Sequence, residues 1–86
     1  MNDVITTEDG REVHHLILAE EVSFFNKASV LKSLENIPNN AKVVIDCTKS
    51  KSIAHDVLEL IKNFESNAKS KNITVEKINF IEPTIL

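Results

Sequence analysis

The sequence predicts an α/β fold, a mixed four-stranded sheet with helices packed mainly on one face. Val43, Val44 and Ile45 form an apolar, largely β-branched run, which is typical of a strand buried on both faces. From Ile53 onward apolar residues recur at helical spacing. The expected order is strand, short strand, helix, strand, helix, strand. Its two strand–helix–strand crossovers imply parallel pairing. Two helices are too few to cover both faces of such a sheet.

The N-terminal third is predicted to hold a flexible segment and two extended pieces. Residues 1–10 are polar, and Asp9-Gly10 is typical of a turn. Glu12–Ala19 alternates as a strand with two largely apolar faces. Val22–Phe25 is the second, shorter extended piece. It contains Phe24 and Phe25, two of the four phenylalanines, so we expect it to be anchored in the core.

Two helices and a last strand follow. Asn26 is a candidate N-cap, and a buried stripe is expected on the helix that ends before Pro38. That stripe comprises Ala28, Val30, Leu31, Leu34 and Ile37. The second helix is expected from about Ile53 to Lys71, with Asn72 as its C-cap and a strand from Ile73. The predicted organisation is a flexible segment over 1–10, one domain over 11–80 and a tail over 81–86.

Composition narrows the function classes. Eighty-six residues make one domain, since domains run from about 50 to 250 residues. The net charge of −3 gives no general attraction to phosphate backbones, so no nucleic-acid partner is expected. A single cysteine makes no internal disulfide. No apolar run approaches the roughly 18 residues of a spanning helix, and the acidic N-terminus is no signal peptide.

The candidate functional residues follow the central strand. Sites in open α/β sheets lie where the carboxyl end of a strand meets a helix start, which here is the region from Asp46 to Asp56. We call the predicted partner or anion surface the contact surface. It comprises Thr48, Lys49, Ser50, Lys51, Ser52, His55 and Asp56. Its lysines and hydroxyls could hold an anion or a nucleotide phosphate. A solvated loop is the favoured interpretation, because no glycine is present to form a backbone cradle.

No catalytic, metal or cofactor site is expected. Cys47 has no second cysteine and is interpreted as a structural or partly exposed thiol. His14 and His15 are adjacent on a strand and point to opposite faces, so they cannot chelate one metal together. His55 stands alone, whereas zinc needs three or four convergent ligands. No Ser-His-Asp or paired-carboxylate arrangement suggests catalysis.

One stretch resembles a known family. VSFFNKASVLKSLENIPNNAKVVIDCTKSKSIAHDVLELI is similar to a STAS domain, the module shared by sulfate transporters and anti-sigma-factor antagonists. Within it, LAEEVSFFNKASVLKSLENIP is similar to the cytosolic carboxy-terminal STAS domain of prokaryotic SulP anion transporters. The resemblance covers about Val13 to Ile78. It implies a STAS-like fold and a regulatory role for a domain attached to a membrane protein.

The resemblance departs from the antagonist branch at one motif. There a strand ending in Asp precedes an Asp-Ser-Ser-Gly motif, which aligns here with residues 54–57. Both serines are absent, and His55 and Asp56 stand in the place of hydroxyl phospho-acceptors. Because reversible serine phosphorylation needs a hydroxyl, we expect no phosphorylation switch at this position. A carboxylate at Asp56 is instead favoured by the helix dipole.

The resemblance implies a cytosolic regulatory and interaction domain of a SulP-type transporter of sulfate or a related anion. Transport itself would belong to a membrane domain outside these residues, and the domain would lie at the cytoplasmic face of the inner membrane. The isolated chain is expected to be soluble. The partner would be that membrane domain or a cytosolic regulatory protein, and a homodimer is a further alternative. The alternative function is a free-standing antagonist-type STAS protein that acts by protein–protein binding without serine phosphorylation.

Overall fold

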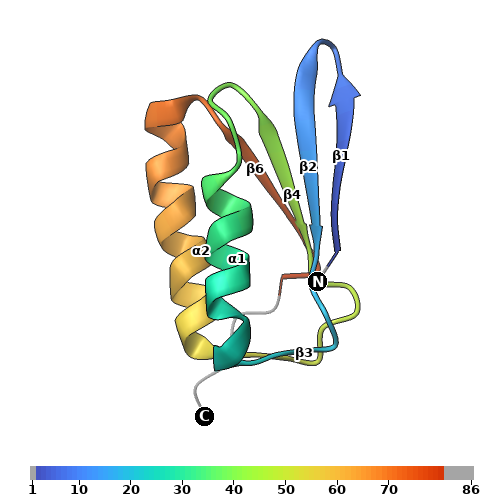
Figure 1. Ribbon diagram of the computed structural model, residues 1–86, viewed down its shortest axis with the longest axis vertical. Helices are drawn as coiled ribbons and strands as arrows, with labels where there is room; N and C mark the ends of the chain where they lie inside the picture. The colour runs from blue at the N-terminus through green and yellow to red at the C-terminus, as the bar shows by residue number, and fades with distance from the viewer. Residues whose placement is uncertain (1, 81–86) are drawn as a thin grey trace.

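The computed structural model describes residues 2–80 and confirms the predicted α/β fold. A four-stranded mixed sheet has the order β1-β2-β4-β6 (Figure 1). Strands β1 (Asn2–Glu8) and β2 (Arg11–Ile17) form an antiparallel hairpin. Strand β4 (Lys42–Asp46) runs parallel to β2, and β6 (Thr74–Ile78) runs parallel to β4. The two crossovers that precede β4 and β6 each contain a helix, as parallel pairing requires.

Both helices pack on one face of the sheet (Figure 1). Helix α1 (Lys27–Glu35) ends shortly before Pro38, as predicted. Helix α2 (His55–Ala68) continues into the 3₁₀ helix η2 (Lys69–Lys71). Asn72 terminates it in the left-handed conformation, with φ of 55°, so the predicted C-cap is confirmed. Neither helix is long and apolar enough to cross a membrane within the described chain.

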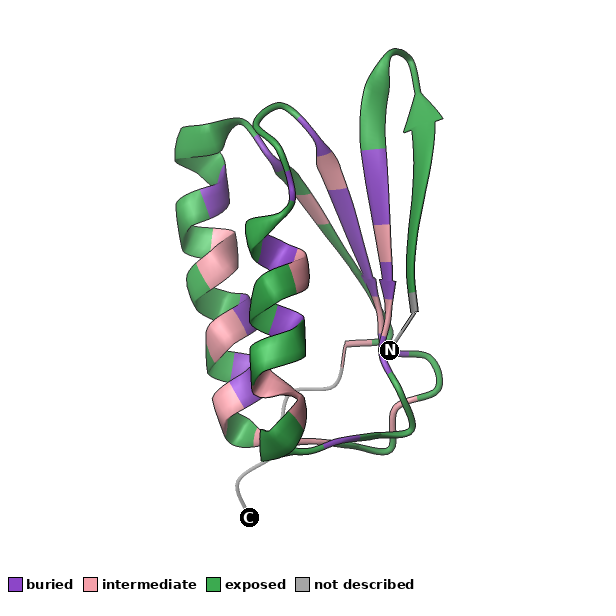
Figure 2. Cartoon of the chain, in the orientation of Figure 1, coloured by how far each residue is buried: buried purple, intermediate pink, exposed green. Residues whose placement is uncertain are grey.

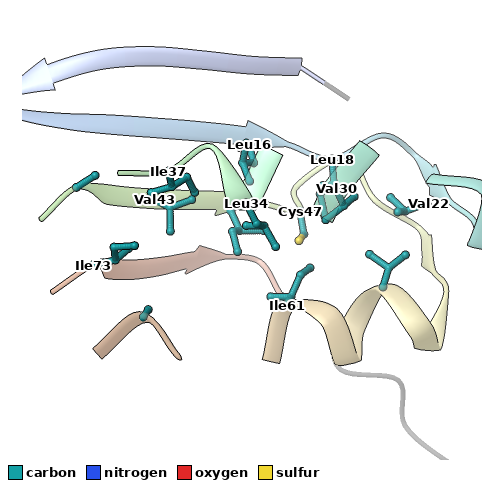
Figure 3. Close-up of a cluster of buried hydrophobic side chains, with 14 residues drawn as sticks. Leu16, Leu18, Val22, Val30, Leu34, Ile37, Val43, Cys47, Ile61 and Ile73 are labelled. Atoms are coloured by element: carbon teal, nitrogen blue, oxygen red, sulfur yellow. The ribbon is translucent and has the colours of Figure 1, made fainter. Parts of the chain in front are cut away.

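The core lies between the sheet and the helices (Figures 2 and 3). Strand β4 is its centre, since Val43 is 0% and Ile45 is 1% exposed. Val44 lies on the opposite face of the sheet and is 7% exposed, so this strand is buried on both faces. The strand composition therefore predicted burial correctly. The helices contribute their sheet-facing residues, but two residues of the predicted buried stripe, Ala28 and Leu31, are exposed, Leu31 at 39%. The buried cluster comprises Leu16, Leu18, Val22, Val30, Leu34, Ile37, Ala41, Val43, Ile45, Cys47, Val57, Ile61, Ala68 and Ile73.

A second, two-stranded sheet lies at the carboxyl end of the main one. Strands β3 (Glu21–Val22) and β5 (Ser52–Ile53) pair in parallel. The backbone N–H of Ala54 extends this pairing by donating to the carbonyl oxygen of Val22 over 2.7 Å. The second helix therefore begins at His55 rather than at Ile53, because Ile53 belongs to a strand. This small sheet fixes the loop after β4 against the loop after β2.

The prediction of a flexible segment over 1–10 is wrong for residues 2–8. These residues form β1 and pair with β2 in an unbroken register from Asn2 opposite Ile17 to Glu8 opposite Arg11. The polar composition hid a run of four β-branched residues, from Val4 to Thr7, that suits an edge strand. The predicted turn is confirmed, since Asp9 and Gly10 both have positive φ. The predicted tail over 81–86 lies outside the described residues.

The expected core anchor at Phe24 and Phe25 is also wrong. Phe24 is 61% and Phe25 is 88% exposed, and both belong to a 3₁₀ helix, η1 (Phe24–Asn26). Ser23 caps this helix, because its backbone N–H donates to Asn26 Oδ1 over 2.8 Å and its hydroxyl accepts from the Phe25 N–H. Asn26 thus uses its side chain at η1 and makes no side-chain cap for α1, although it precedes that helix as predicted.

Candidate functional site

The contact surface begins in a tight turn after β4. Asp46 Oδ1 accepts the backbone N–H of Thr48 over 2.9 Å, and the Ser50 N–H donates to the carbonyl oxygen of Cys47 over 3.0 Å. Asn79, just beyond β6, donates from its side-chain amide to Thr48 Oγ1 over 2.9 Å. These bonds hold the loop at the carboxyl ends of β4 and β6, where sequence reasoning expected a site.

The second half of the loop is bound to the segment after β2. The Ser50 hydroxyl donates to the Ala19 carbonyl oxygen over 2.7 Å, and the Lys51 N–H donates to the Glu20 carbonyl oxygen over 2.7 Å. The Lys51 ammonium also lies 3.0 Å from Glu20 Oε1. Both side chains of this ion pair are largely exposed, so the pair contributes little to stability. It does offset the charge of Lys51 on this surface.

These contacts argue against an anion cradle in the loop. A phosphate cradle needs free backbone N–H groups that converge on one point. The N–H groups of Thr48, Ser50, Lys51 and Ser52 instead donate to Asp46, Cys47 and Glu20. A shallow cavity of about 220 Å³ is present, and Ser50, Lys51 and Ser52 line it together with Cys47, Ile53, Leu58 and Asn79. Thr48, Lys49, His55 and Asp56 are not among its lining residues.

The remaining predicted residues open helix α2. His55 Nε2 lies 3.1 Å from Glu59 Oε1, one turn along the helix, and both side chains are exposed. Asp56 is half-buried in the first turn, where its carboxylate is favoured by the helix dipole. Ala54 precedes the helix and makes no side-chain cap. The contact surface thus consists of two adjoining parts, the loop and the helix start, which β5 connects.

Two exposed phenylalanines adjoin the helix start. Val22 of β3 pairs with Ile53 of β5. The chain continues from Val22 into η1 and from Ile53 into α2. Helices η1 and α2 lie against each other. Phe24 and Phe25, which we call the aromatic pair, stand edge to face with ring centroids 6.0 Å apart. Their exposure is contrary to the core position predicted from the sequence. The signal was Ser23 followed three residues later by Asn26, a capping pattern that turns the chain before the rings reach the core.

Asp46 and Cys47, which follow the buried residues of β4, have pKa values that are shifted in opposite directions. Hydrogen bonds from the Thr48 side chain and backbone lower the pKa of the Asp46 carboxyl below its ordinary value. Burial raises the pKa of the Cys47 thiol, and the negative charge of Asp46 adds to that effect. Cys47 is only 2% exposed. It therefore packs as a protonated core thiol, in agreement with its structural interpretation.

The three histidines lie apart, on different elements or faces. His14 is buried at 3% exposure, and its Nε2 lies 3.2 Å from Glu12 Oε1. His15 points to the opposite face, as predicted, with its Nε2 3.1 Å from Thr6 Oγ1. Across residues 2–80, no three side chains of His, Cys, Asp or Glu gather closely enough to hold a metal ion.

Comparisons with known proteins support the fold. No protein-family model matches the chain, and no curated protein matches it. A crystal structure of Mglu superimposes with a TM-score of 0.69 at 19% sequence identity over 95% of this chain. The matched region is 20% of the Mglu chain, so these residues span about one fifth of that protein. The chain therefore has a small α/β fold, with a four-stranded mixed sheet and two helices, that is consistent with a STAS-like fold.

Proposed function

We propose that this chain is a STAS-type interaction domain that regulates a SulP-type anion transporter from the cytosolic side. The resemblance of residues 22–61 to STAS domains and the STAS-consistent sheet support the fold part of this proposal. The same fold occurs in Mglu as one part of a longer chain, which fits a domain that works attached to another. The observation that carries the functional part is the exposed aromatic pair beside the contact surface.

The aromatic pair has the character of a binding anchor. Large exposed aromatic rings are unfavourable in water, and interface hot spots are enriched in aromatic residues that become fully desolvated on binding. The capping hydrogen bonds of Ser23 hold the backbone of Phe24 and Phe25 in a defined turn. Little backbone entropy is therefore lost when a partner buries the two rings. Lys49 and Asp56, together with the Lys51–Glu20 ion pair, supply a mixed-charge rim that can fix the orientation of a partner.

The occupant that we propose is the membrane domain of the same transporter. The SulP resemblance implies such a domain in the same full-length protein. Serine phosphorylation would not control the contact, because His55 and Asp56 replace the phospho-acceptor positions. The interaction would depend instead on the aromatic anchor and the charged rim. It should therefore weaken as salt concentration rises.

The full-length reading frame gives the first test. The SulP proposal requires on the order of ten or more apolar spans encoded together with these residues, each of about 20 residues. A frame without membrane segments would overturn it and favour the free-standing antagonist-type alternative.

Two surface variants test the docking role. Phe25→Ala should weaken binding to the membrane domain about tenfold or more, because it removes a central aromatic anchor. Asp56→Lys should impair regulation or transport through the charged rim. Phe25→Ala should change the unfolding free energy by only about 0.5 kcal/mol, since Phe25 is 88% exposed. Asp56→Lys should cost about 1 kcal/mol, because Asp56 is half-buried and the helix dipole disfavours a positive charge in the first turn. Affinity for the solubilised membrane domain and transport by the full-length protein are the measurements.

Leu31→Ala is the matched control for the docking test. Leu31 is also an exposed apolar residue, at 39%, but it lies on α1 and lines a different hollow with Leu34 and Leu60. Its truncation should leave binding and transport unchanged. If folded Phe25→Ala and Asp56→Lys proteins behave like Leu31→Ala, neither the aromatic pair nor the helix start is a docking site.

The absence of a side-chain hydroxyl from residues 53–57 leads to a separate prediction. Treatment with serine kinases that act on STAS proteins should leave Ile53–Val57 unmodified, because this segment contains no serine or threonine. Mass spectrometry of the treated protein is the measurement, with an antagonist-type STAS protein as a positive control. Phosphate located in this segment would contradict the alignment on which the proposal rests.

A further inference from the structure

Strand β1 is an open edge of the sheet. In the described chain it pairs with β2 on one side, and no strand covers its other side (Figure 1). Alternate residues of an edge strand direct their backbone N–H and C=O groups outward, where another strand can receive them. The strand is exposed along residues 3–8 (Figure 2). Val4 is 47% and Ile5 is 57% exposed.

The middle of this edge lacks the features that usually protect one. Natural edges are blunted by charged side chains, above all lysines, and by prolines, bulges or short length. Strand β1 has seven residues, no lysine and no proline, and its register with β2 is continuous. Its two charged residues, Asp3 and Glu8, flank an uncharged run from Val4 to Thr7. The opposite edge, β6, differs. It has five residues and carries Glu76 and Lys77, which form ion pairs with Lys42 and Glu65. The unprotected edge is therefore β1.

We propose that β1 pairs antiparallel with β1 of a second copy of this chain, about a two-fold axis at Ile5. The product is a homodimer with a continuous eight-stranded sheet. The axis runs normal to the sheet, so all helices stay on one face. The two contact surfaces lie at opposite ends, away from the pairing. This inference is independent of the proposed function, because the edge used here is separate from the contact surface.

Geometry limits the register. Opposite residues in an antiparallel ladder both direct their backbone groups toward the neighbouring strand or both direct them away. Two copies of one strand can therefore pair only with odd positions opposite odd and even opposite even. If the two-fold axis passes at Ile5, every residue of β1 has a partner in β1 of the second copy. If it passes at Val4, Thr7 and Glu8 have no partner within the strand. If it passes at Thr6, Val4 lies opposite Glu8.

The register centred on Ile5 is also self-complementary in charge and polarity. It sets Ile5 opposite Ile5 of the second copy and Val4 opposite Thr6, so the β-branched residues meet. It sets Asp3 opposite Thr7, and Glu8 falls opposite position 2. No carboxylate faces another carboxylate directly, which would be destabilising. A seven-residue edge is smaller than the interfaces of stable complexes, so the dimer should dissociate on dilution.

Site-specific disulfide formation tests the register directly. In the Ile5→Cys protein the two new cysteines would have Cα atoms about 4.5–5.5 Å apart, within reach of a disulfide. In the matched Thr7→Cys protein they would be four positions apart along the strands, about 13 Å, and beyond reach. The wild-type chain controls for Cys47, which is buried. With oxidised glutathione as the oxidant, Ile5→Cys should cross-link and Thr7→Cys should not, as read on non-reducing gels.

Two lysine variants supply a second, non-covalent test. Ile5→Lys sets two ammonium groups opposite each other and should weaken dimerisation at least tenfold. Thr7→Lys sets an ammonium opposite Asp3 and should preserve or strengthen it. Sedimentation equilibrium over a concentration series measures both, with circular dichroism to verify folding. A wild-type chain that stays monomeric at millimolar concentration overturns the proposal. So does equal cross-linking of the two cysteine variants.

Discussion

Asp46 and Thr48 show how one residue sets the ionisation of another in this site. The hydrogen bonds from Thr48 favour the charged carboxylate, and the nearby charge of Lys49 favours it further, so the folded pKa lies below the ordinary value of 3.8. Folding stability gained from this carboxylate is fully present above the unfolded pKa. It is lost as the pH falls through the lower folded pKa. The turn after β4 should therefore persist at neutral pH and weaken only in strong acid.

Thr48→Val should raise the pKa of Asp46 toward its ordinary value. The substitution removes the hydroxyl, which is the largest cause of the lowering, and keeps the backbone N–H, so part of the lowering should remain. Carboxyl chemical shifts followed by NMR across an acid titration measure the change. Thr48→Ser retains a hydroxyl and is the matched control. An Asp46 pKa that is the same in the valine and serine variants would show that the side chain has no such role.

At the scale of the element, β4 determines the core. Ile45 is 1% exposed in the buried cluster, and truncating it to alanine should cost about 2–5 kcal/mol through lost burial and the resulting cavity. Leu31→Ala removes a similar volume from a side chain that is 39% exposed, so it should cost clearly less. Urea unfolding of the two variants measures the difference. Equal losses would mean that β4 is not the centre of the core.

Elements with a strong local pattern could be predicted from the sequence. The run Val43–Ile45 gave the central strand, Pro38 gave the end of the first helix, and Asn72 gave the end of the second. Each signal acts within a few residues, through burial, a steric restriction or a left-handed backbone. Strand β5 gave no such signal, and β3 (Glu21–Val22) overlaps the extended piece expected over Val22–Phe25 at one residue only, because two residues are too few to show a period of two. Their pairing depends on tertiary contacts.

The location of the candidate site could be predicted from the sequence, but the full set of residues that form it could not. The carboxyl end of β4 followed from general rules for open α/β sheets. The partners Glu20 and Asn79 could not be identified, since they come from distant loops that meet only in the folded chain. Phe24 and Phe25 were assigned to the core because apolar residues are usually buried. Local capping by Ser23 overrode that tendency and turned both rings outward.

At the scale of the whole molecule, contacts between loops and strand ends hold the strands of the main sheet together at both of its ends. The pairing of β3 with β5 joins the loops at the carboxyl ends of β2 and β4. At the other end, Arg11 joins the starts of three strands. Its Nε donates to the Asn40 carbonyl oxygen over 2.8 Å. Its Nη2 donates to the Ala41 carbonyl oxygen over 3.0 Å and to Thr74 Oγ1 over 3.1 Å.

Arg11→Lys should therefore lower stability by about 1–2 kcal/mol, since a single ammonium cannot reproduce the three bonds of the planar guanidinium. For a domain of this size each kcal/mol corresponds to a fall in Tm of about 4–8 °C. Amide exchange should also rise at Asn40, Ala41 and Thr74, where the strands would open first. Lys51→Met is the control, because the exposed pair of Lys51 with Glu20 should be worth at most about 1 kcal/mol. If the two variants unfold at the same temperature, with unchanged exchange at Thr74, Arg11 does not fasten this end of the sheet.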